Sequence, residues 1–503
     1  MVQPEKSKRA SHPVHRLRSE EAGVAVLTVL LAIVLLLILS SALFLTARLA
    51  LERAAQTTDS TRALNVAESG MEAAANAIIA QGFVAPDDGT ISGSLAGGGD
   101  YDVHWDAQTA LPWFTMMATG YHPNEANATG VRRITAQVFA LNPWDFQYAG
   151  GMVGNTVNGN VWVQGPFYVN DELLMSGTAG VHQGPLIIHD NEGVGGSGDL
   201  ILNSNSADVG SAGSPVPLFI DGQVIGHTES YYADPVYDSA PELEFPELTP
   251  DDLADYYYSS TSPSPWQSEE EAPMAVWDVD STIDGDTALT FSDKTVQPQA
   301  DDSTNMTRFL SDPNRVNWSY STLGSTITLT IKFDNTPYGG LDEVRPILFV
   351  DGNLTIEASK HFQVRYEGKG TIIANGKISV KGSLVPTGSD PLVSDLSSTT
   401  LTGFPETNRL GLITLTEIAY EGSGDDWLAA ALYGGGTVSF SKQGNFIGST
   451  VTGALNLGNQ VPHLYTQPDF SNKLPPGMPG GDGRITSIMG WTEMTPPSPE
   501  ASN

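Results

Sequence analysis

The chain has 503 residues, of which 24 are basic and 58 acidic, so its formal net charge is −34, and it contains no cysteine. The absence of cysteine excludes disulfides, thiolate metal sites and cysteine nucleophiles. So acidic a chain repels nucleic acid, and we expect no nucleic-acid partner. Glycine (52) and proline (32) are frequent, which favours short strands and tight turns over helical bundles.

The first long feature is an apolar stretch from Ala22 to Ala47 that contains no charged residue. As a helix it spans roughly 39 Å, more than the hydrocarbon core of about 30 Å. Buried helices of soluble proteins rarely run so long without a polar face. A cleaved signal sequence usually has a shorter apolar region. We therefore interpret the stretch as a retained, single-pass anchor in the cytoplasmic (inner) membrane.

Basic residues dominate the leader, residues 1–21, which we expect to be disordered and cytoplasmic. Because basic flanks tend to stay in the cytoplasm, the N-terminus is predicted to lie inside and the C-terminal part to be extracytoplasmic.

Helical periodicity continues beyond the anchor. Apolar residues recur at spacings of three and four, which places them on one helix face, at Leu64, Ala67, Met71, Ala74 and Ile78. We predict one long helix over residues 22–82, with its second half packed on a soluble domain.

Strand-like runs replace the helical pattern in residues 83–148. Residues 100–105 and 131–141 alternate between polar and apolar side chains, and residues 113–118 form an apolar run between them. Turn-forming residues separate the three runs. They predict a small three-stranded antiparallel sheet that covers the amphipathic half of the helix.

A recurring unit follows, in which an apolar tripeptide precedes Asp-Gly or Asn-Gly and a second apolar strand, as in LFIDGQV, LFVDGNLTI and IIANGKISV. Repeated strands with such corners indicate a solenoid. We predict a mainly-β domain, a right-handed parallel β-helix, in two parts, residues 149–227 and 341–472. A β-sandwich is the alternative, since Asn-Gly also marks hairpins.

Two further segments complete the chain. Residues 228–340 are rich in Asp, Glu, Ser, Pro and Tyr, and we interpret them as an acidic insertion that projects from the β-helix. Residues 473–503 form a Pro/Gly-rich tail, in which residues 485–493 have the composition of a segment that docks on the domain.

Candidate sites for chemistry are few. Clustered carboxylates are oxygen ligands suited to calcium, and the candidates are Asp278, Asp280, Asp284 and Asp286. A solvated acidic turn is the alternative, because their spacing does not match an EF-hand loop. No other cofactor or metal is expected; His182 and His189 flank Pro185 and suit separate strands.

Catalysis is not expected, and we assign no catalytic residue. Asp190, Asp221 and Asp351 are the nearest carboxylates for polysaccharide chemistry on a β-helix, but Asp221 and Asp351 each precede a glycine and are explained as corners. Aromatic residues of the insertion can contact a sugar or a partner protein, or cover a small core of their own, namely Tyr256, Tyr257, Tyr258, Trp266 and Trp277.

The segment Ala63–Ile78 (ALNVAESGMEAAANAI), placed after a basic leader, a glycine and a long apolar helix, resembles the N-terminal region of PilX-type minor pilins. In that family a prepilin peptidase commonly cuts after a glycine before the apolar run, and Gly23 is the matching position. The family's usual glutamate falls at Thr28, where this chain departs from the pattern. The repeats are similar to β-helical domains that often follow PilX-like N-termini.

This resemblance implies a structural component of a type IV pilus or secretion pseudopilus, which displays a β-helical ectodomain for assembly or surface adhesion. Its partners would be other pilins, through the N-terminal helix, the lipid bilayer, and a surface ligand or polysaccharide. The alternative is a permanently anchored surface adhesin or a carbohydrate-binding or carbohydrate-active β-helix protein.

Overall fold

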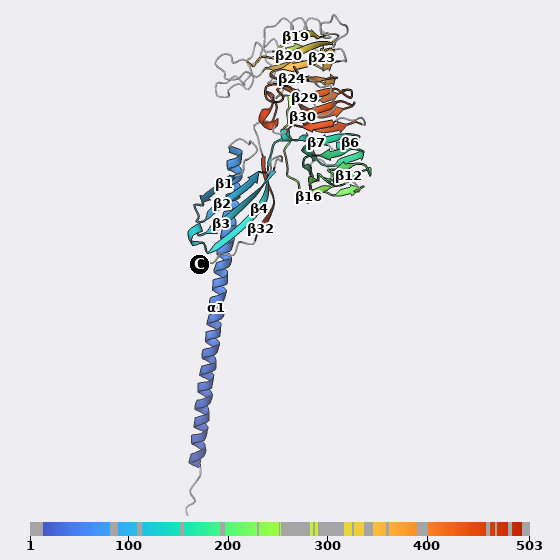
Figure 1. Cartoon of the computed structure of the whole chain (residues 1–503). Coiled ribbons are helices and arrows are strands. Elements are labelled where there is room, and N and C mark those ends of the chain that lie inside the picture. The colour runs from blue at the N-terminus through green and yellow to red at the C-terminus, as the bar shows by residue number, and fades with distance from the viewer. Residues whose placement is uncertain are drawn as a thin grey trace, which may run out of the picture.

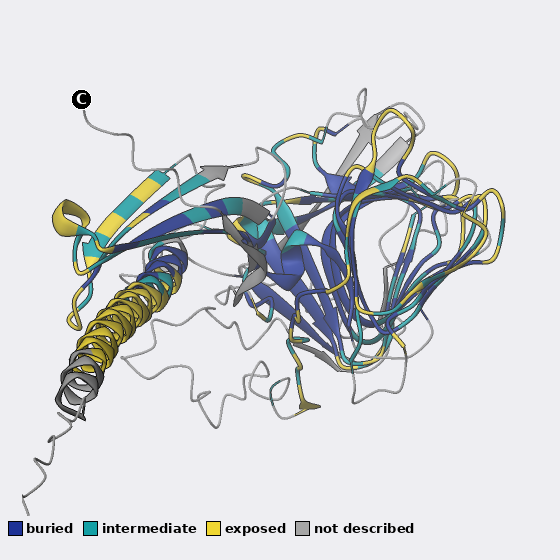
Figure 2. Cartoon of the chain, turned by 90° about the horizontal axis from the view of Figure 1, so that it is seen from below, coloured by how far each residue is buried: buried dark blue, intermediate teal, exposed yellow. Residues whose placement is uncertain are grey.

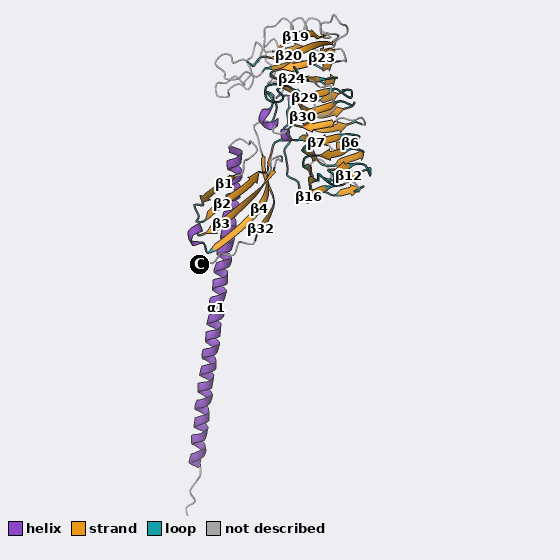
Figure 3. Cartoon of the chain, in the orientation of Figure 1, coloured by secondary structure: helices purple, strands orange, loops and turns teal. Residues whose placement is uncertain are grey.

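The computed structural model of the protein describes residues 14–80, 89–107, 113–150, 155–191, 197–228, 231–250, 252, 282–284, 287–289, 316–323, 326–335, 346–358, 362–389, 401–458, 463–467, 470–480 and 485–494. It consists of a long helix, an antiparallel sheet that covers the helix's C-terminal end, and a large stack of parallel strands (Figure 1). Beyond the helix the described chain is almost entirely strand and loop (Figure 3). The predicted fold class, an α+β part followed by a mainly-β domain, is confirmed.

Helix α1 runs from Val14 to Ala80 without interruption, over 67 residues, which is about 100 Å at 1.5 Å per residue. It begins at Val14, so the prediction of a disordered leader is wrong for residues 14–21. The polar stretch after the anchor is also helical, and the hydroxyls of Thr57, Thr58 and Thr61 donate to carbonyls four residues earlier.

The antiparallel sheet has five strands, in the order β1-β2-β3-β4-β32. Their bounds are Gly89–Ser94 (β1), Asp100–Ala107 (β2), Trp113–His122 (β3), Gly130–Leu141 (β4) and Ile485–Met494 (β32). The three predicted strands are β2, β3 and β4, but the predicted number is wrong. The strand β32 comes from the C-terminal segment and pairs with β4, so the segment that we expected to dock on the domain completes its sheet.

The helix packs on this sheet at unusually close range. Ala67, Met71 and Ala74, three residues of the predicted face, are buried in the shared core, and Leu64 packs against it. A Cβ at Gly70 would lie 2.8 Å from the Cβ of Tyr101, and one at Gly120 would lie 2.1 Å from the carbonyl oxygen of Ala63. Glycine is unfavourable in a helix interior. The close approach of Tyr101, which leaves no room for a Cβ, explains why residue 70 is nevertheless a glycine.

The parallel strands form the coils of a solenoid, because most pair in parallel with the strands one coil before and one coil after. The first set of coils contains Gln147–Ala149 (β5), Asn155–Gly159 (β6), Trp162–Gln164 (β7), Phe167–Asn170 (β8), Leu173–Gly177 (β9), Gly180–His182 (β10), Leu186–His189 (β11), Leu200–Leu202 (β12), Asp208–Val209 (β13), Val216–Ile220 (β14), Val224–Gly226 (β15) and Ala233–Tyr237 (β16).

The second set contains Thr282–Asp284 (β17), Thr287–Leu289 (β18), Val316–Leu323 (β19), Thr326–Phe333 (β20), Ile347–Asp351 (β21), Leu354–Glu357 (β22), Phe362–Glu367 (β23), Lys369–Ala374 (β24), Ile378–Lys381 (β25), Leu384–Pro386 (β26), Arg409–Thr414 (β27), Glu417–Tyr420 (β28), Trp427–Phe440 (β29), Asn445–Leu457 (β30) and His463–Thr466 (β31). In the solenoid sheet, antiparallel strand pairing is confined among the described strands to β19 and β20. The β-sandwich alternative is therefore wrong, and the topology is that of a parallel β-helix.

The repeated sequence unit corresponds to two strands and the corner between them. Asp221 and Gly222 join β14 to β15, Asp351 and Gly352 join β21 to β22, and Asn375 and Gly376 join β24 to β25. The prediction of strand–corner–strand repeats is confirmed.

The order of the coils in space differs from their order in the sequence. The chain enters the stack at β5, winds to one end at β16, and resumes at the other end with β17 (Figure 1). It then winds back until β30 pairs with β5 and β6, and β31 pairs with β7. The chain therefore both enters and leaves the solenoid near its middle.

Part of the predicted insertion belongs to this stack. Strands β17 and β18 pair in parallel with β21 and β22, and β20 pairs with β23. Leu329, Ile331 and Phe333 of β20 join the solenoid core. The prediction that residues 228–340 project as a whole is therefore wrong, because their apolar alternation fits the same stack.

Two cores stabilise the solenoid. One continuous apolar cluster fills the interior along both sets of coils, and exposed residues gather in the loops at the corners (Figure 2). A second, outer cluster lies on the face formed by β5, β8, β11, β14 and their counterparts in the second set. An extended segment, residues 240–248, crosses this outer face and is called the strap below; its Leu243, Phe245 and Leu248 pack against the cluster.

Candidate functional site

Among the described residues, most of the exposed large apolar side chains lie on the N-terminal part of α1. From Val24 to Leu51 its large apolar side chains are all exposed, for example Leu36 at 63% and Phe44 at 72%. Among the described residues, α1 is the one helix long and apolar enough to cross a membrane. Exposed apolar area of this extent marks a surface that contacts lipid or other proteins.

Three hydroxyl groups on this surface, those of Thr28, Ser41 and Thr46, make hydrogen bonds within the helix. Thr28 Oγ1 donates to the carbonyls of Val24 (3.0 Å) and Ala25 (2.9 Å), and Ser41 and Thr46 make equivalent bonds of 2.8 Å. Each polar group must be satisfied internally where no water is present. The helix can therefore lie in lipid or among apolar helices without leaving these hydroxyls unpaired.

A small polar cluster stands where α1 emerges from the sheet. Arg132 Nε donates to Ser60 Oγ at 2.5 Å. Arg62 Nη1 lies 3.3 Å from His122 Nε2, and Asp59 Oδ1 lies 3.8 Å from the same nitrogen. These contacts fix the helix against β3 and β4 at the boundary between its packed and its exposed part.

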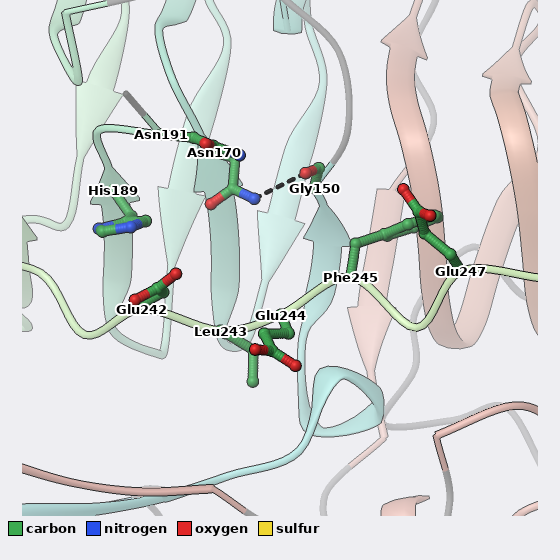
Figure 4. A pocket seen from close by; sticks show the side chains of 9 residues that line it. All are labelled: Gly150, Asn170, His189, Asn191, Glu242, Leu243, Glu244, Phe245 and Glu247. Carbon is green, nitrogen blue, oxygen red and sulfur yellow. Dashed lines mark hydrogen bonds between the residues drawn. The ribbon is translucent and has the colours of Figure 1, made fainter. Parts of the chain in front are cut away.

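A cavity of about 420 Å³ lies beside the strap (Figure 4), lined by Gly150, Asn170, His189, Asn191, Glu242, Leu243, Glu244, Phe245 and Glu247. Asn170 Nδ2 donates to the carbonyl of Gly150 at 2.6 Å. The walls of the cavity are the outer face of the first coils and the strap itself. Three strap glutamates make the lining acidic, yet no group of three or more His, Asp or Glu in the described parts of the chain has the arrangement of a metal site.

Buried tyrosines hold the strap on the outer face. Tyr148 Oη donates to the carbonyl of Leu243 at 2.6 Å, and Tyr168 Oη donates to that of Pro241 at 3.0 Å. Tyr433 Oη donates to the carbonyl of Pro246 at 2.7 Å. Burial raises the pKa of the Tyr148 and Tyr168 hydroxyls well above 10. The strap thus ties β5 and β8 of the first set to β29 of the second.

Two of the three residues considered for polysaccharide chemistry, Asp190 and Asp221, are joined by a hydrogen bond that involves the backbone of Asp190. Asp221 Oδ2 accepts from the backbone N–H of Asp190 at 2.9 Å and lies 2.7 Å from His189 Nδ1, while its Oδ1 accepts from the N–H of Ala240 at 2.7 Å. Asp221 therefore organises a corner and the start of the strap. Asp351 ends β21 in the second set of coils.

Only some of the remaining predicted positions lie among the described residues. Gly23 lies within α1. Of the calcium candidates, Asp284 ends β17, whereas Asp278, Asp280 and Asp286 lie outside the described residues, as do the aromatic residues named for the insertion. His182 and His189 lie on the separate strands β10 and β11, as expected.

Sequence reasoning missed the outer aromatic cluster and the strap. Tyr148 stacks on Tyr168 with ring centroids 4.9 Å apart, and Phe245 of the strap lies between Tyr148 and Tyr433, 6.0 and 5.8 Å away. The available signal was the run of apolar residues without polar alternation in β8 and β14, since strands buried on both faces read as continuous apolar runs.

A scan against protein-family models finds no match for this chain, and a search of curated proteins finds none. Among solved structures, the chain is similar to the crystal structure of the competence-associated pilin ComZ from Thermus thermophilus. The identity is 13%, the TM-score is 0.38, and the match covers 86% of this chain and 97% of that one. Function is therefore argued from the residues and the fold.

Proposed function

We propose that the protein is a pilin-like structural component of a type IV pilus or of a related secretion pseudopilus. In this proposal α1 anchors the protein in the cytoplasmic membrane, with its N-terminus inside, before assembly. During assembly the same helix packs among the N-terminal helices of other pilins, and the solenoid is displayed on the outer side for assembly or adhesion.

The observation that carries the proposal is the division of one unbroken helix into two surfaces. Between Ala63 and Ala75 one face of the helix is packed under the antiparallel sheet, whereas the large apolar side chains from Val24 to Leu51 are exposed. Moving this part out of lipid is unfavourable unless other apolar surface replaces the lipid. Helix association in place of lipid contact supplies that surface.

The orientation follows from charge. Lys6, Lys8, Arg9, Arg16 and Arg18 precede the apolar stretch, and basic flanks favour the cytoplasmic side. The position of the solenoid at the opposite end of the molecule from the apolar part of α1 (Figure 1) suits display away from the membrane.

The path of the chain also supports display. In the sequence, the solenoid strands stand between β4 and β32 of the antiparallel sheet. Two segments of chain therefore connect the solenoid to this sheet. Such a connection transmits the position of the helix to the solenoid more firmly than a single linker.

The test is the N-terminus of the mature protein, determined by mass spectrometry of protein from membranes and from sheared surface filaments. Cleavage after Gly23, abolished by Gly23→Val or by loss of the prepilin peptidase, supports the proposal. An intact Met1 in every membrane-bound copy would favour a permanently anchored adhesin instead.

The proposal includes no catalysis and no cofactor. Incubation of the purified protein with acidic polysaccharides tests this directly. New reducing or unsaturated ends that depend on Asp221 would contradict a purely structural role.

A further inference from the structure

An exposed tryptophan stands in a row of aligned polar residues on the outside of the solenoid. Trp162 of β7 is 43% exposed, whereas Trp144 and Trp427 are fully buried. Its indole lies between two imidazoles, with ring centroids 5.5 Å from His463 and 5.6 Å from His182. An exposed indole that is held between two imidazole rings offers a flat aromatic surface of fixed orientation.

The row arises from the register of the coils. Trp162 is paired with His463 of β31 on one side and with Gly180 of β10 on the other. Gly180 is in turn paired with Asp208 of β13. Four residues, His463, Trp162, Gly180 and Asp208, therefore lie side by side across four strands, over about 14 Å at the usual strand spacing of about 4.8 Å.

Gly180 provides the space beside the indole. A Cβ at this position would lie 2.2 Å from Asp208 Oδ1 and 2.5 Å from His182 Nε2. In the absence of a side chain at residue 180, the carboxylate and the imidazole occupy this space and lie 3.4 Å apart at these two atoms.

Polar side chains of the row and of the adjacent His182 remain partly open to solvent. His182 Nε2 and Asp208 Oδ1 face each other across 3.4 Å, and these two atoms, like His463 Nδ1, are shielded from solvent. The His182 and Asp208 side chains are still 24% and 33% exposed, so the rest of the imidazole and of the carboxylate faces solvent. These exposed atoms are within reach of a ligand that lies on the indole of Trp162.

From this geometry we propose that Trp162, His182, Asp208 and His463 bind a neutral oligosaccharide. The apolar face of a sugar ring lies on the indole, and its hydroxyls bond to the carboxylate and the imidazoles. A hydroxyl both donates and accepts, as a neutral imidazole does, and a carboxylate accepts. An ammonium ligand fits less well, since it only donates and is usually enclosed by several aromatic rings.

The row also favours a chain of sugars over a single one, because its contacts extend along the solenoid axis. Sugar binding would give the displayed solenoid of the proposed function a ligand, but the binding residues all belong to the solenoid. Binding by the purified protein is independent of cleavage at Gly23 and of filament assembly, so failure of either proposal can be distinguished from failure of the other.

The experiment uses the full chain in lauryldimethylamine oxide, a detergent without a sugar headgroup. Binding is measured by isothermal titration with hexasaccharides of cellulose, chitin, amylose and dextran, with choline and a lysine hexapeptide as cationic probes. We expect at least one hexasaccharide to bind, Trp162→Ala to lower its affinity at least tenfold, and Asp208→Asn to lower it several-fold. Tyr232→Ala is the matched control, since Tyr232 is 41% exposed on the solenoid but lies outside the row, and should leave binding unchanged.

A second measurement uses the unaltered protein and does not depend on the folding of a variant. Oxidation of Trp162 by N-bromosuccinimide is followed by mass spectrometry, and the bound hexasaccharide should protect this tryptophan. The proposal is overturned if no hexasaccharide binds at millimolar concentration or if only the cationic probes bind. It is also overturned if the Trp162→Ala variant binds the hexasaccharide as tightly as the unaltered protein, or if the bound hexasaccharide does not protect Trp162 in the unaltered protein.

Discussion

The indole Nε1 of Trp144 donates a hydrogen bond of 2.7 Å to the carbonyl of Pro479, which lies 335 residues later in the chain. Two residues before Trp144, Asn142 Nδ2 donates to the carbonyl of Gly480 at 3.0 Å. These bonds join the segment that leaves β4 for the solenoid to the segment that returns to form β32. The antiparallel sheet and the solenoid are thus connected by two segments of chain that are hydrogen-bonded to each other.

The first prediction concerns this junction. Trp144→Phe keeps an aromatic ring but removes the donor, so the carbonyl of Pro479 loses its partner. We expect the free energy of unfolding to fall by roughly 1–3 kcal/mol. The measurement is denaturant unfolding of the full chain in detergent. Trp162→Phe, at an exposed ring, is the control, and equal effects of the two variants would contradict the role of the junction.

The second prediction concerns the close contact between α1 and β3. Gly120→Ala places a Cβ 2.1 Å from the carbonyl oxygen of Ala63, so helix and strand must separate. Overpacking of this kind typically costs about 1–3 kcal/mol, and we expect a lower melting temperature of the helix–sheet part. Gly97→Ala is the control, because a Cβ there has no atom within 4 Å. A Gly120→Ala variant as stable as the control would refute the close packing.

The third prediction concerns β32. Removal of residues 481–503 leaves β4 at the edge of the sheet, without the pairing that runs from Ile485–Leu141 to Met494–Arg133. Hydrogen exchange of β4 amides should accelerate by roughly tenfold or more, since exchange follows local stability. Strands β27 to β29 should be unchanged. Unaltered exchange in β4 would show that β32 does not stabilise the sheet.

The fourth prediction concerns the strap at high pH. The folded Tyr148 and Tyr168 have raised pKa values, so the unfolded chain loses these protons first. Their contribution to stability is complete below pH 10 and is lost as the pH rises above it, by up to about 1.4 kcal/mol per pH unit for each phenol. Unfolding free energies at pH 9, 10 and 11 measure this slope.

The control for the alkaline slope is the variant with both Tyr148→Phe and Tyr168→Phe, which cannot ionise at these positions. Its slope should be shallower but not zero, because Tyr366 and Tyr420 are also buried and their pKa values are raised by burial. The same slope in both proteins would mean that the two strap tyrosines ionise normally.

Much of the fold could be predicted from local patterns. The spacing of Ala67, Met71 and Ala74 identified the packed helix face, and the Asp-Gly and Asn-Gly corners identified the coils. Each of these signals lies within a few residues of the structure that it specifies.

The rest depends on contacts between distant parts of the chain. No local feature of residues 485–494 identifies β4 as their partner, and none places β30 beside β5. The Trp162 row depends on the register between coils, which pairs His463 with Trp162, 301 positions earlier in the chain. Only the stacked coils bring these residues together.

The central claim is that the exposed part of α1 exchanges lipid for other helices. A photo-crosslinking amino acid at Leu36, 63% exposed, tests it in cells that produce the assembly machinery, with the same amino acid at Ser92 of β1 as control. We expect Leu36 to crosslink to the N-terminal helices of other pilins when the assembly motor is active, and only to lipid when the motor is absent. Crosslinks from Leu36 to lipid alone, with the motor active and filaments present, would contradict it.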